Sequence, residues 1–422
     1  MSAAEDPQAS GTGGGLYYGW YVVAALFFVL TITSGLAFYN LSVYMRALTT
    51  DAGFPVTAVS SAIAVFFLAS GFGGLGAGRL LQRRDPRFTI VAGGVVGTVS
   101  LLMLGRVTTP LELHLVYAVF GLGHACCTLV SATTLVTRWF TEKRSIALSV
   151  ASTGLSLGGI LLTPASAAII ERVGLAAATP WFAAAWFLGV IPVTLLVIRD
   201  RPALPAAGDA PAPLDGWRRE EALPSRWFVV ITASWVLVML AQVGTLSHLF
   251  NLAALRVDAA TAATAVSVMA TASICGRFLG GWLITRIDTR MFALACIAGQ
   301  ALALVGLAFA VTQGSVLLAS VAFGATVGNL LMLQPLLLAE VFGARDYPRI
   351  YSVSQLLSTL GVAAGPAIVG GLYDLLGGYG AALLVPAVAS AVAFAMMLWV
   401  GRLPDGRPPS TVGAAQREED GS

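Results

Sequence analysis

The sequence predicts an all-α membrane protein with twelve transmembrane helices in two parallel six-helix repeats. The chain of 422 residues is 57% hydrophobic and only 11% charged, whereas soluble domains carry about 25% charged residues. Apolar runs of the roughly 20 residues that cross a bilayer recur along it. A constant spacing also relates segments of its first half to segments of its second half. These three observations together predict the fold class.

The apolar runs predict where the helices and the domains lie. The twelve expected helices cover about 17–48, 57–81, 88–106, 110–138, 144–171, 176–198, 226–255, 259–285, 290–311, 315–341, 350–374 and 379–401. Residues 199–225 are rich in Pro, Ala and charge, which is typical of a solvated linker. We therefore expect two six-helix bundles, at 17–198 and 226–403, joined by the linker 199–225 and flanked by disordered tails at 1–16 and 404–422.

A charged loop occurs twice with the same spacing. The stretch GRLLQRRDPR begins at Gly78, and GWLITRIDTR begins 203 residues later, at Gly281. The charged positions that the two copies contribute to this motif are Arg83, Asp85, Arg87, Arg286, Asp288 and Arg290. The same spacing pairs Phe120-Gly121 with Phe323-Gly324. Two halves of equal topology predict a binding site between them, near the middle of the membrane.

The basic residues predict the orientation in the membrane. Of the 24 Lys and Arg residues, 19 lie in the loops, linker and tail of one side, and four lie in the loops of the other. Cytoplasmic loops carry the excess of Lys and Arg. We therefore expect a multi-pass protein of the inner, cytoplasmic membrane, with both termini and the linker in the cytoplasm. The net charge of +3 follows from this topology and does not indicate nucleic acid.

One charged side chain falls deep inside an expected helix. Arg277 precedes the loop residue Arg286 by nine positions, which places it roughly 13 Å into the helix. A buried arginine is costly, and such residues mark substrate and ion pathways. The sequence shows no buried carboxylate to neutralise it, so we expect Arg277 to bind an anionic substrate. Its alternatives are a pairing with Glu340 or an extended side chain that reaches cytoplasmic water.

Two histidines lie inside expected helices, where either can exchange a proton near neutral pH. His248 is a candidate for the substrate cavity or for proton coupling. His124 begins a stripe with Thr128, Ser131 and Arg138 on one helical face. A purely structural hydrogen bond is the alternative for each histidine. Asn329 is a weaker candidate for substrate binding.

The sequence lacks the motifs of soluble catalysis. No nucleotide-binding Walker loop and no H-E-x-x-H zinc motif occur, so we expect neither an enzyme nor a cofactor. The adjacent Cys126 and Cys127 fall in an apolar segment, and we interpret them as small apolar side chains rather than metal ligands. We expect a monomer whose partners are its solute, protons and the lipid bilayer.

The doubled loop resembles the signature of the major facilitator superfamily, G-x-x-x-D-R-x-G-R. The resemblance covers nearly the whole chain and implies a transporter with twelve helices. Gln82 stands where the family has Asp, and Asp85 where it has Gly, while Thr285 takes the Asp position of the second copy. A gating salt bridge from that family Asp is therefore absent here.

A narrower resemblance is to the bacterial monocarboxylate porters and their oxalate/formate antiporter relatives. It rests on YYGWYVVAALFF (17–28), TRWFTEKRSIALSVASTGLSLGGILLTP (137–164) and SICGRFLGGW (273–282). In both groups an arginine of helix 8 binds the substrate carboxylate, and Arg277 falls on it. The family's helix 1 lysine falls near Tyr39 and Asn40. The helix 11 lysine of oxalate carriers falls on Gln355, so one fixed positive charge remains.

One cation matches a monoanion better than a dianion. We therefore expect a secondary transporter of a small organic monoanion, driven by proton symport or anion exchange. An efflux carrier for a hydrophobic or cationic drug is the alternative within transport. Such carriers usually hold an acidic residue in the cavity. A membrane sensor is a remote alternative, because the linker is too short for an output domain.

Overall fold

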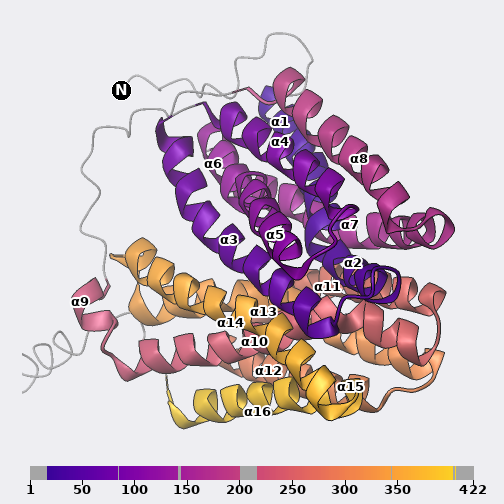
Figure 1. The fold of residues 1–422 in the computed structure, drawn as a ribbon. Coiled ribbons are helices and arrows are strands. Elements are labelled where there is room, and N and C mark those ends of the chain that lie inside the picture. Colours follow the sequence, from indigo (N-terminus) through magenta and orange to yellow (C-terminus); the bar gives the residue numbers. More distant parts are fainter. Residues whose placement is uncertain are drawn as a thin grey trace, which may run out of the picture.

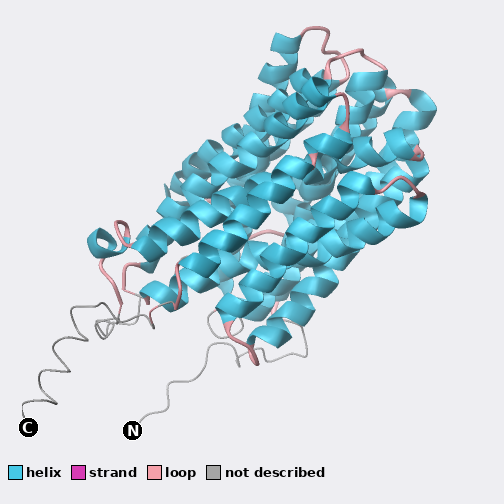
Figure 2. Ribbon diagram, turned by 90° about the horizontal axis from the view of Figure 1, so that it is seen from below, coloured by secondary structure: helices cyan, strands magenta, loops and turns pink. Residues whose placement is uncertain are grey.

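The computed structural model describes residues 17–83, 85–140, 144–199, 216–343, 345–402 and 404. All regular elements among these residues are helices (Figure 2). Twelve helical stretches are long and apolar enough to cross a membrane. The predicted fold class is therefore confirmed. The expected tail at 1–16, the expected tail at 404–422 apart from residue 404, and residues 200–215 of the expected linker lie outside the described residues.

The first half contributes six of the membrane-spanning stretches. Two of them are composite: the first joins α1, the π-helical η1 and α2, and the fourth joins α5 and α6. The elements are α1 (Tyr18–Thr33), η1 (Ser34–Tyr39), α2 (Asn40–Thr50), α3 (Val56–Arg83), α4 (Pro86–Leu104), α5 (Pro110–Cys126), α6 (Leu129–Trp139), α7 (Arg144–Val173) and α8 (Leu175–Leu196).

The second half contributes the other six. A short helix, α9, precedes it, and its last span joins α15 and α16. The elements are α9 (Arg219–Ala222), α10 (Arg226–Arg256), α11 (Ala259–Ile284), α12 (Thr289–Phe309), α13 (Gln313–Phe342), α14 (Tyr347–Leu376), α15 (Tyr379–Ala382) and α16 (Leu384–Trp399).

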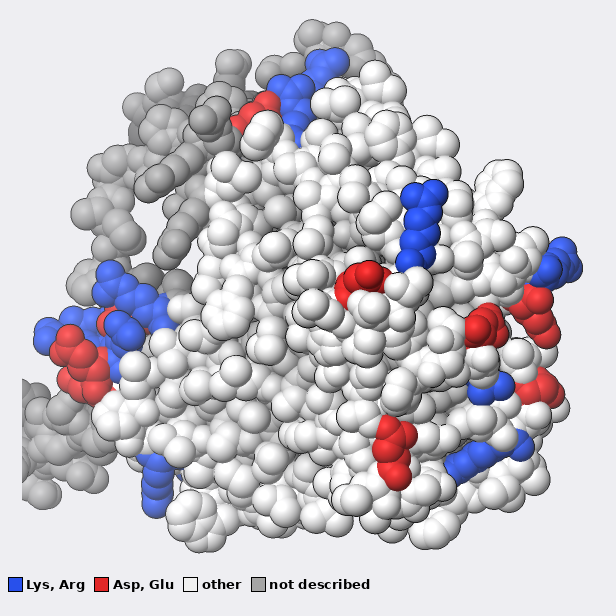
Figure 3. Space-filling model, in the orientation of Figure 1, with Lys and Arg blue, Asp and Glu red and all other residues white. Residues whose placement is uncertain are grey.

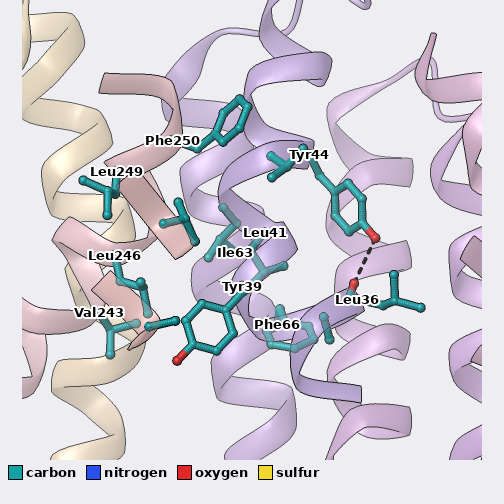
Figure 4. Close-up of a cluster of buried hydrophobic side chains, with 14 of the residues drawn as sticks. Leu36, Tyr39, Leu41, Tyr44, Ile63, Phe66, Val243, Leu246, Leu249 and Phe250 are labelled. Atoms are coloured by element: carbon teal, nitrogen blue, oxygen red, sulfur yellow. Dashed lines mark hydrogen bonds between the residues drawn. The ribbon is translucent and has the colours of Figure 1, made fainter. Parts of the chain in front are cut away.

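The two halves form separate bundles that face each other (Figure 1). We call the side where α8 ends and α10 begins the linker side, and the opposite side the far side. Contacts between the bundles run from α3 to α14, from α7 to α11 and from α2 to α10. Side chains of both halves share one apolar cluster at this seam, including Tyr39, Ile63, Val243 and Leu246 (Figure 4).

The sequence repeat is also a repeat of packing. In the first half Gly121 of α5 lies so close to the Phe66 carbonyl of α3 that a Cβ would collide with it. In the second half Gly324 of α13 lies in the same way against the Met269 carbonyl of α11. Both members of the second pair lie 203 residues after their counterparts. Small residues permit this close approach of membrane helices, so the two bundles use the same helix contact.

Polar and aromatic groups mark the two ends of the helices. In the face drawn in Figure 3, charged side chains gather near α9 at the left and lie scattered from the middle of the view to its right-hand edge, and the area between these two groups is uncharged. On the linker side the Trp139 indole donates to the Arg199 carbonyl at 2.9 Å, and the Trp227 indole donates to the Arg402 carbonyl at 3.3 Å. Tryptophans at this level are typical of a membrane–water interface.

The last part of the expected linker is folded onto the second half. Gly216 pairs with Gly343 in an isolated bridge, and the Trp217 amide donates to the Phe342 carbonyl at 2.9 Å. The Trp217 ring is 3% exposed and packs edge-on against Phe342 and Trp227. The expectation of a solvated segment is therefore wrong for these residues. The Pro- and Ala-rich composition of the segment gave no sign that Trp217 packs against the second half.

Candidate functional site

Arg277 lies on α11 beside the helix face that packs against α13. A Cβ at Gly276 would press on the Ala325 carbonyl, and one at Gly280 would collide with the side-chain oxygen of Asn329. These two glycines bring α11 and α13 into close contact. Ser267, ten residues before Arg277 on the same helix, donates to the Ile160 carbonyl of α7 at 3.3 Å. The helix that carries Arg277 thus borders the seam between the halves.

The Arg277 guanidinium has no hydrogen bond or ion pair among the described residues, and its Nε is buried without a partner. Glu340, the carboxylate considered for it, is exposed and instead accepts from the Thr289 hydroxyl at 2.7 Å. The surrounding pocket on the linker side is lined by Asp288, Arg290, Met291, Glu340, Val341, Arg402 and Pro404. A structural pairing between Arg277 and Glu340 is therefore not formed.

Tyr39 approaches Arg277 from the first half. It ends the π-helical segment η1, is 6% exposed and interacts electrostatically with the Arg277 guanidinium. Its hydroxyl lies beside Ser156, and Gly159 lies against its ring, both on α7. Figure 4 shows the ring reaching from η1 toward Val243 of α10. A phenol from one half and a guanidinium from the other therefore lie within electrostatic range of each other at the seam.

The π-helical segment explains how Tyr39 is placed. Just before it, the hydroxyls of Thr31 and Thr33 donate to the carbonyls four residues earlier, at 2.8 and 2.9 Å. Within it, the Ser34 hydroxyl donates to the Leu155 carbonyl of α7. Such side-chain bonds to the backbone compete with the regular helical pattern. Single π-helical turns occur frequently at functional sites, where they redirect a side chain.

Asn40, the neighbour of Tyr39, points away from the seam. It is fully buried, and its amide nitrogen donates to Ser166 at 2.7 Å and to Tyr44 at 3.3 Å. All of these partners belong to the first half. Adjacent residues of a helix face different directions, so the structure separates Asn40 from Tyr39.

The two other polar candidates lie on the second half alone. Asn329 is 7% exposed and donates to the Ala325 carbonyl of its own helix at 2.9 Å. It lies at the contact of α11 with α13, one turn from Arg277 by way of Gly280. Gln355 is exposed near the linker side of α14 and accepts from the Tyr351 hydroxyl at 3.1 Å. Neither makes a described contact with Arg277.

His248 lies toward the far side of α10 and is fully hydrogen-bonded. Its Nδ1 is 2.9 Å from the Tyr379 hydroxyl, and its Nε2 is 3.0 Å from the Pro366 carbonyl. A carbonyl only accepts, so Nε2 carries the hydrogen and Nδ1 accepts from Tyr379. Nε2 also lies 3.3 Å from the Ser60 hydroxyl of the first half, which donates to the Val56 carbonyl. The imidazole is 0% exposed, and its partners hold it at the seam.

More polar contacts between the halves surround His248. Asn251 donates to the Tyr379 hydroxyl at 2.9 Å and accepts from Arg46 of α2 at 3.5 Å. At the end of α14, Asp374 accepts from both the amide and the hydroxyl of Thr57 on α3. We call this group the far-side network; its members are Arg46, Thr57, Ser60, His248, Asn251, Pro366, Asp374 and Tyr379. Sequence analysis missed every member except His248, although Asn251 shares its helix face three positions later.

His124 bonds within the first half. Its Nδ1 lies 3.2 Å from the Ser70 hydroxyl of α3, and its ring packs against Phe66. The predicted stripe that follows it is interrupted, because α5 ends at Cys126 and α6 begins only at Leu129. Thr128 at the break is extended and its hydroxyl donates to the Ala125 carbonyl at 3.1 Å. The prediction of one continuous helical face is therefore wrong.

The repeated loop motif caps helices on the linker side. Asp85 accepts from the Arg87 amide at 2.9 Å at the start of α4, and Asp288 accepts from the Met291 amide at 2.9 Å at the start of α12. Arg290 donates to the last carbonyls of α16, those of Met397 and Leu398. The remaining motif positions are Gly78 within α3, Arg286 stacked over Trp282, and Arg83, whose side chain lies outside the described part of the chain.

Asp85 and Arg87 also form an ion pair with a 2.7 Å contact. Partial burial opposes ionisation of Asp85, but bonds from the Arg87 side chain and backbone, with the charges of Arg87 and Arg138, lower its pKa below the ordinary value. The Asp that departs from the family signature thus serves as a helix cap. In the described residues no group of three or more His, Cys, Asp or Glu side chains is arranged to hold a metal.

Two six-helix repeats that face each other, with polar groups of both halves meeting at the seam, form an architecture that is typical of membrane transporters. The family model of the Major Facilitator Superfamily matches residues 27–333 and 228–419, so the chain belongs to this family. It is a multi-pass membrane transporter and not an enzyme.

Relatives and solved structures agree with this assignment. The chain is 24% identical to monocarboxylate transporter 13 of Bos taurus over 87% of its own length and 86% of the relative's. It is 22% identical to MFS-type transporter 1 of an Ophiocordyceps species, over 81% and 75%. A match to the oxalate:formate antiporter of Oxalobacter formigenes, 23% identical, spans 41% of each chain. These relatives confirm the resemblance to the monocarboxylate branch.

The fold also superposes on a bacterial homolog of the human lysosomal transporter Spinster, solved in an inward-facing and occupied conformation. The TM-score is 0.72 at 16% identity, and the match covers 94% of this chain and all of the other. At this identity the likeness concerns the fold alone.

Proposed function

We propose that this transporter carries a small organic monoanion across the membrane by alternating access, through proton symport or anion exchange. The observation that supports the proposal is the unpartnered Arg277 guanidinium at the seam, next to Tyr39 of the other half. A guanidinium matches a carboxylate in a bidentate geometry. A solute held between the halves is in place to be released on either side when they rock.

The charge at this seam favours an anion over a cationic drug. Among the described residues, Arg277 is the charged group that interacts with Tyr39, and no carboxylate interacts with either. Charge complementarity therefore supports the monocarboxylate-like solute. One fixed cation also matches a single carboxylate better than two.

We further propose that the linker side is cytoplasmic, in the inner membrane. The support is the excess of Lys and Arg on that side in the sequence. Reporter fusions after Ser422 and in the linker are expected to show cytoplasmic activity. A reporter that is active only outside the cell would overturn this orientation.

Coupling to protons would require a titratable group, and His248 is our candidate because it is buried at the seam. We expect His248→Gln to weaken pH-driven uptake into vesicles and to leave solute-for-solute exchange largely intact. His124→Gln is the comparison, since His124 bonds inside one half. If both variants keep the parent's pH profile, anion exchange without protons is favoured.

A thermal-shift screen against a panel of carboxylates tests the solute class. A ligand that binds the folded protein stabilises it by about 2.7 kcal/mol at 100 times its Kd. We expect at least one small monocarboxylate to raise the melting temperature of the parent and of the control Arg286→Gln, whose arginine stacks on Trp282. Arg277→Gln should show no shift. A shift that survives in Arg277→Gln would contradict the proposed site.

A further inference from the structure

The far-side network joins the two halves, and His248 lies at its centre. In the described residues, every hydrogen bond between the halves comes from this network except the one from Ser267 to Ile160 near mid-seam. We propose that the network is a latch that closes the far side, and that protonation of His248 releases it. This inference concerns the conformational equilibrium and does not depend on which solute is carried.

The hydrogen-bond directions show why the latch needs a neutral imidazole. Tyr379 donates to Nδ1 of His248, while its oxygen accepts from Asn251. A proton added to Nδ1 turns that atom into a donor, so the Tyr379 hydroxyl loses its acceptor. The Asn251 amide already donates to the Tyr379 oxygen, and Asn251 itself accepts from Arg46 of the first half. After protonation, Nδ1–H of His248 competes with Asn251 for that oxygen. Protonation therefore weakens the hydrogen bonds that connect α2, α10 and α15.

Burial adds a second reason. The imidazole is 0% exposed, and an ion is stable in such a place only when it is paired. Parting of the halves at Ser60 admits water to the Nε2 side of the ring. The charged imidazole is therefore favoured by the open far side, and the neutral one by the closed far side. By linkage, acid shifts the population toward the open state.

The charged and titratable groups around His248 do not offset this effect. From α2, the Arg46 guanidinium donates to Asn251 and not to the ring. From α14, the Asp374 carboxylate attracts a charge on the imidazole, but it is exposed, is held by Thr57 of α3 and is not hydrogen-bonded to the ring, so solvent screens the attraction. Tyr373 of α14 packs on the Tyr379 ring of α15. From α3 the facing group is the Ser60 hydroxyl. In the described structure no carboxylate is hydrogen-bonded to the imidazole.

The packing leaves no room for the closed latch to adapt. A Cβ at Gly370 of α14 would collide with Ser60 and would stand 3.4 Å from the His248 ring. The backbone of one half thus presses directly on a side chain of the other. Because the two halves pack this closely beside the ring, a rearranged, charged imidazole is accommodated by their separation.

Distance measurements between spin labels on the far side test the proposal. One label replaces Ala52, exposed in the loop after α2, and the other replaces Val311, 70% exposed in the loop between α12 and α13. The exposed Cys275 is replaced by serine to avoid a third label. In nanodiscs without solute, we expect the population of longer distances to rise several-fold between pH 8 and pH 5.

Two variants complete the test. His248→Gln retains one donor for the Pro366 carbonyl and one acceptor for Tyr379 but cannot take a proton, so its distances should not respond to acid. Tyr379→Phe removes the hydroxyl that donates to Nδ1 of His248. This variant weakens the latch without changing the histidine, so it should give longer distances at both pH values. A parent whose distances ignore pH, or a His248→Gln variant that opens in acid as the parent does, would overturn the latch. Neither outcome bears on anion binding at Arg277.

Discussion

Arg277 and His248 are both polar groups inside the second half, yet the protein treats them in opposite ways. The buried Nε of Arg277 has no described partner, while both ring nitrogens of His248 are bonded. A buried polar group without a partner costs free energy, and a satisfied one holds its neighbours in place. The difference supports our proposal that Arg277 binds a ligand, whereas His248 joins the two halves.

The two groups also occupy different levels of the seam. Arg277 lies on the linker-side half of α11, within electrostatic range of Tyr39 of η1. His248 lies on the far-side half of α10, beside Ser60 at the start of α3. An anion at Arg277 would therefore lie on the linker side of the closed network. The arrangement matches a solute site that is shut off from the far side.

The largest effect is expected at Arg277. Arg277→Lys should leave the protein folded but cut transport of the anion severely, because an ammonium does not reproduce the bidentate geometry. Arg277→Gln should abolish binding while the solute-free protein melts at the parent's temperature or above, since an unpaired buried cation is removed. Melting curves with and without ligand measure both. A Gln variant that melts much earlier without ligand would mean that Arg277 is a structural residue.

The next largest effect is expected at His248, where a substitution should lower the stability of the ligand-free protein. His248→Ala leaves the Tyr379 hydroxyl and the Pro366 carbonyl without their partner, and each buried unsatisfied group costs about 1–3 kcal/mol. We therefore expect a clear loss of stability without ligand, where Arg277→Gln shows none. His248→Gln, which retains one donor and one acceptor, should recover most of the loss. Equal melting temperatures for His248→Ala and the parent would contradict the network.

A smaller effect, on anion affinity, is expected at Tyr39 of the first half. Tyr39→Phe keeps the ring against Gly159 but removes the hydroxyl next to Arg277. A hydrogen bond to a charged group contributes about 1.5–3 kcal/mol, so the affinity for the anion should fall about tenfold or more. Titration of the stabilising anion in thermal-shift experiments measures this.

Tyr44→Phe is the matched control. Its hydroxyl donates to the Leu36 carbonyl at 2.9 Å within the first half, as Figure 4 shows. Loss of this bond should lower stability by about 1 kcal/mol and leave affinity unchanged. If the two variants change affinity equally, Tyr39 has no special place at the seam.

Some of these features could be predicted from the sequence, because they depend only on residue composition and on the spacing of the repeat. The absence of a buried acid near Arg277 is readable from residue types, and apolar runs locate spanning helices whatever their packing. The 203-residue spacing predicts the repeat, which reappears as Gly121 against Phe66 and Gly324 against Met269.

Other features depend on contacts between distant segments and were not predictable. His248 is bonded to Pro366 and Tyr379, which lie 118 and 131 positions away in the chain. The direction of Tyr39 results from a π-helical turn, and the break at Thr128 from side chains that bond to the backbone. Local propensity carries no signal for either, because each side chain is also compatible with a regular helix.

The smallest effect is expected at the two helix caps, which lie far from both groups. Asp288 and Asp85 occupy the same place in the repeat and cap α12 and α4. Replacement of either by Ala should lower stability by about 1 kcal/mol, the usual contribution of an N-cap, without changing anion affinity or far-side distances. Because folding lowers the pKa of Asp85, its contribution is present at neutral pH and disappears as the pH falls through that lowered pKa. Melting curves of the parent and Asp85→Ala should therefore differ at pH 7 and converge in strong acid. A cap variant that changes anion affinity as strongly as Tyr39→Phe would show that the linker-side loops and the seam act as one unit, and the separation between a ligand site and a latch would fail.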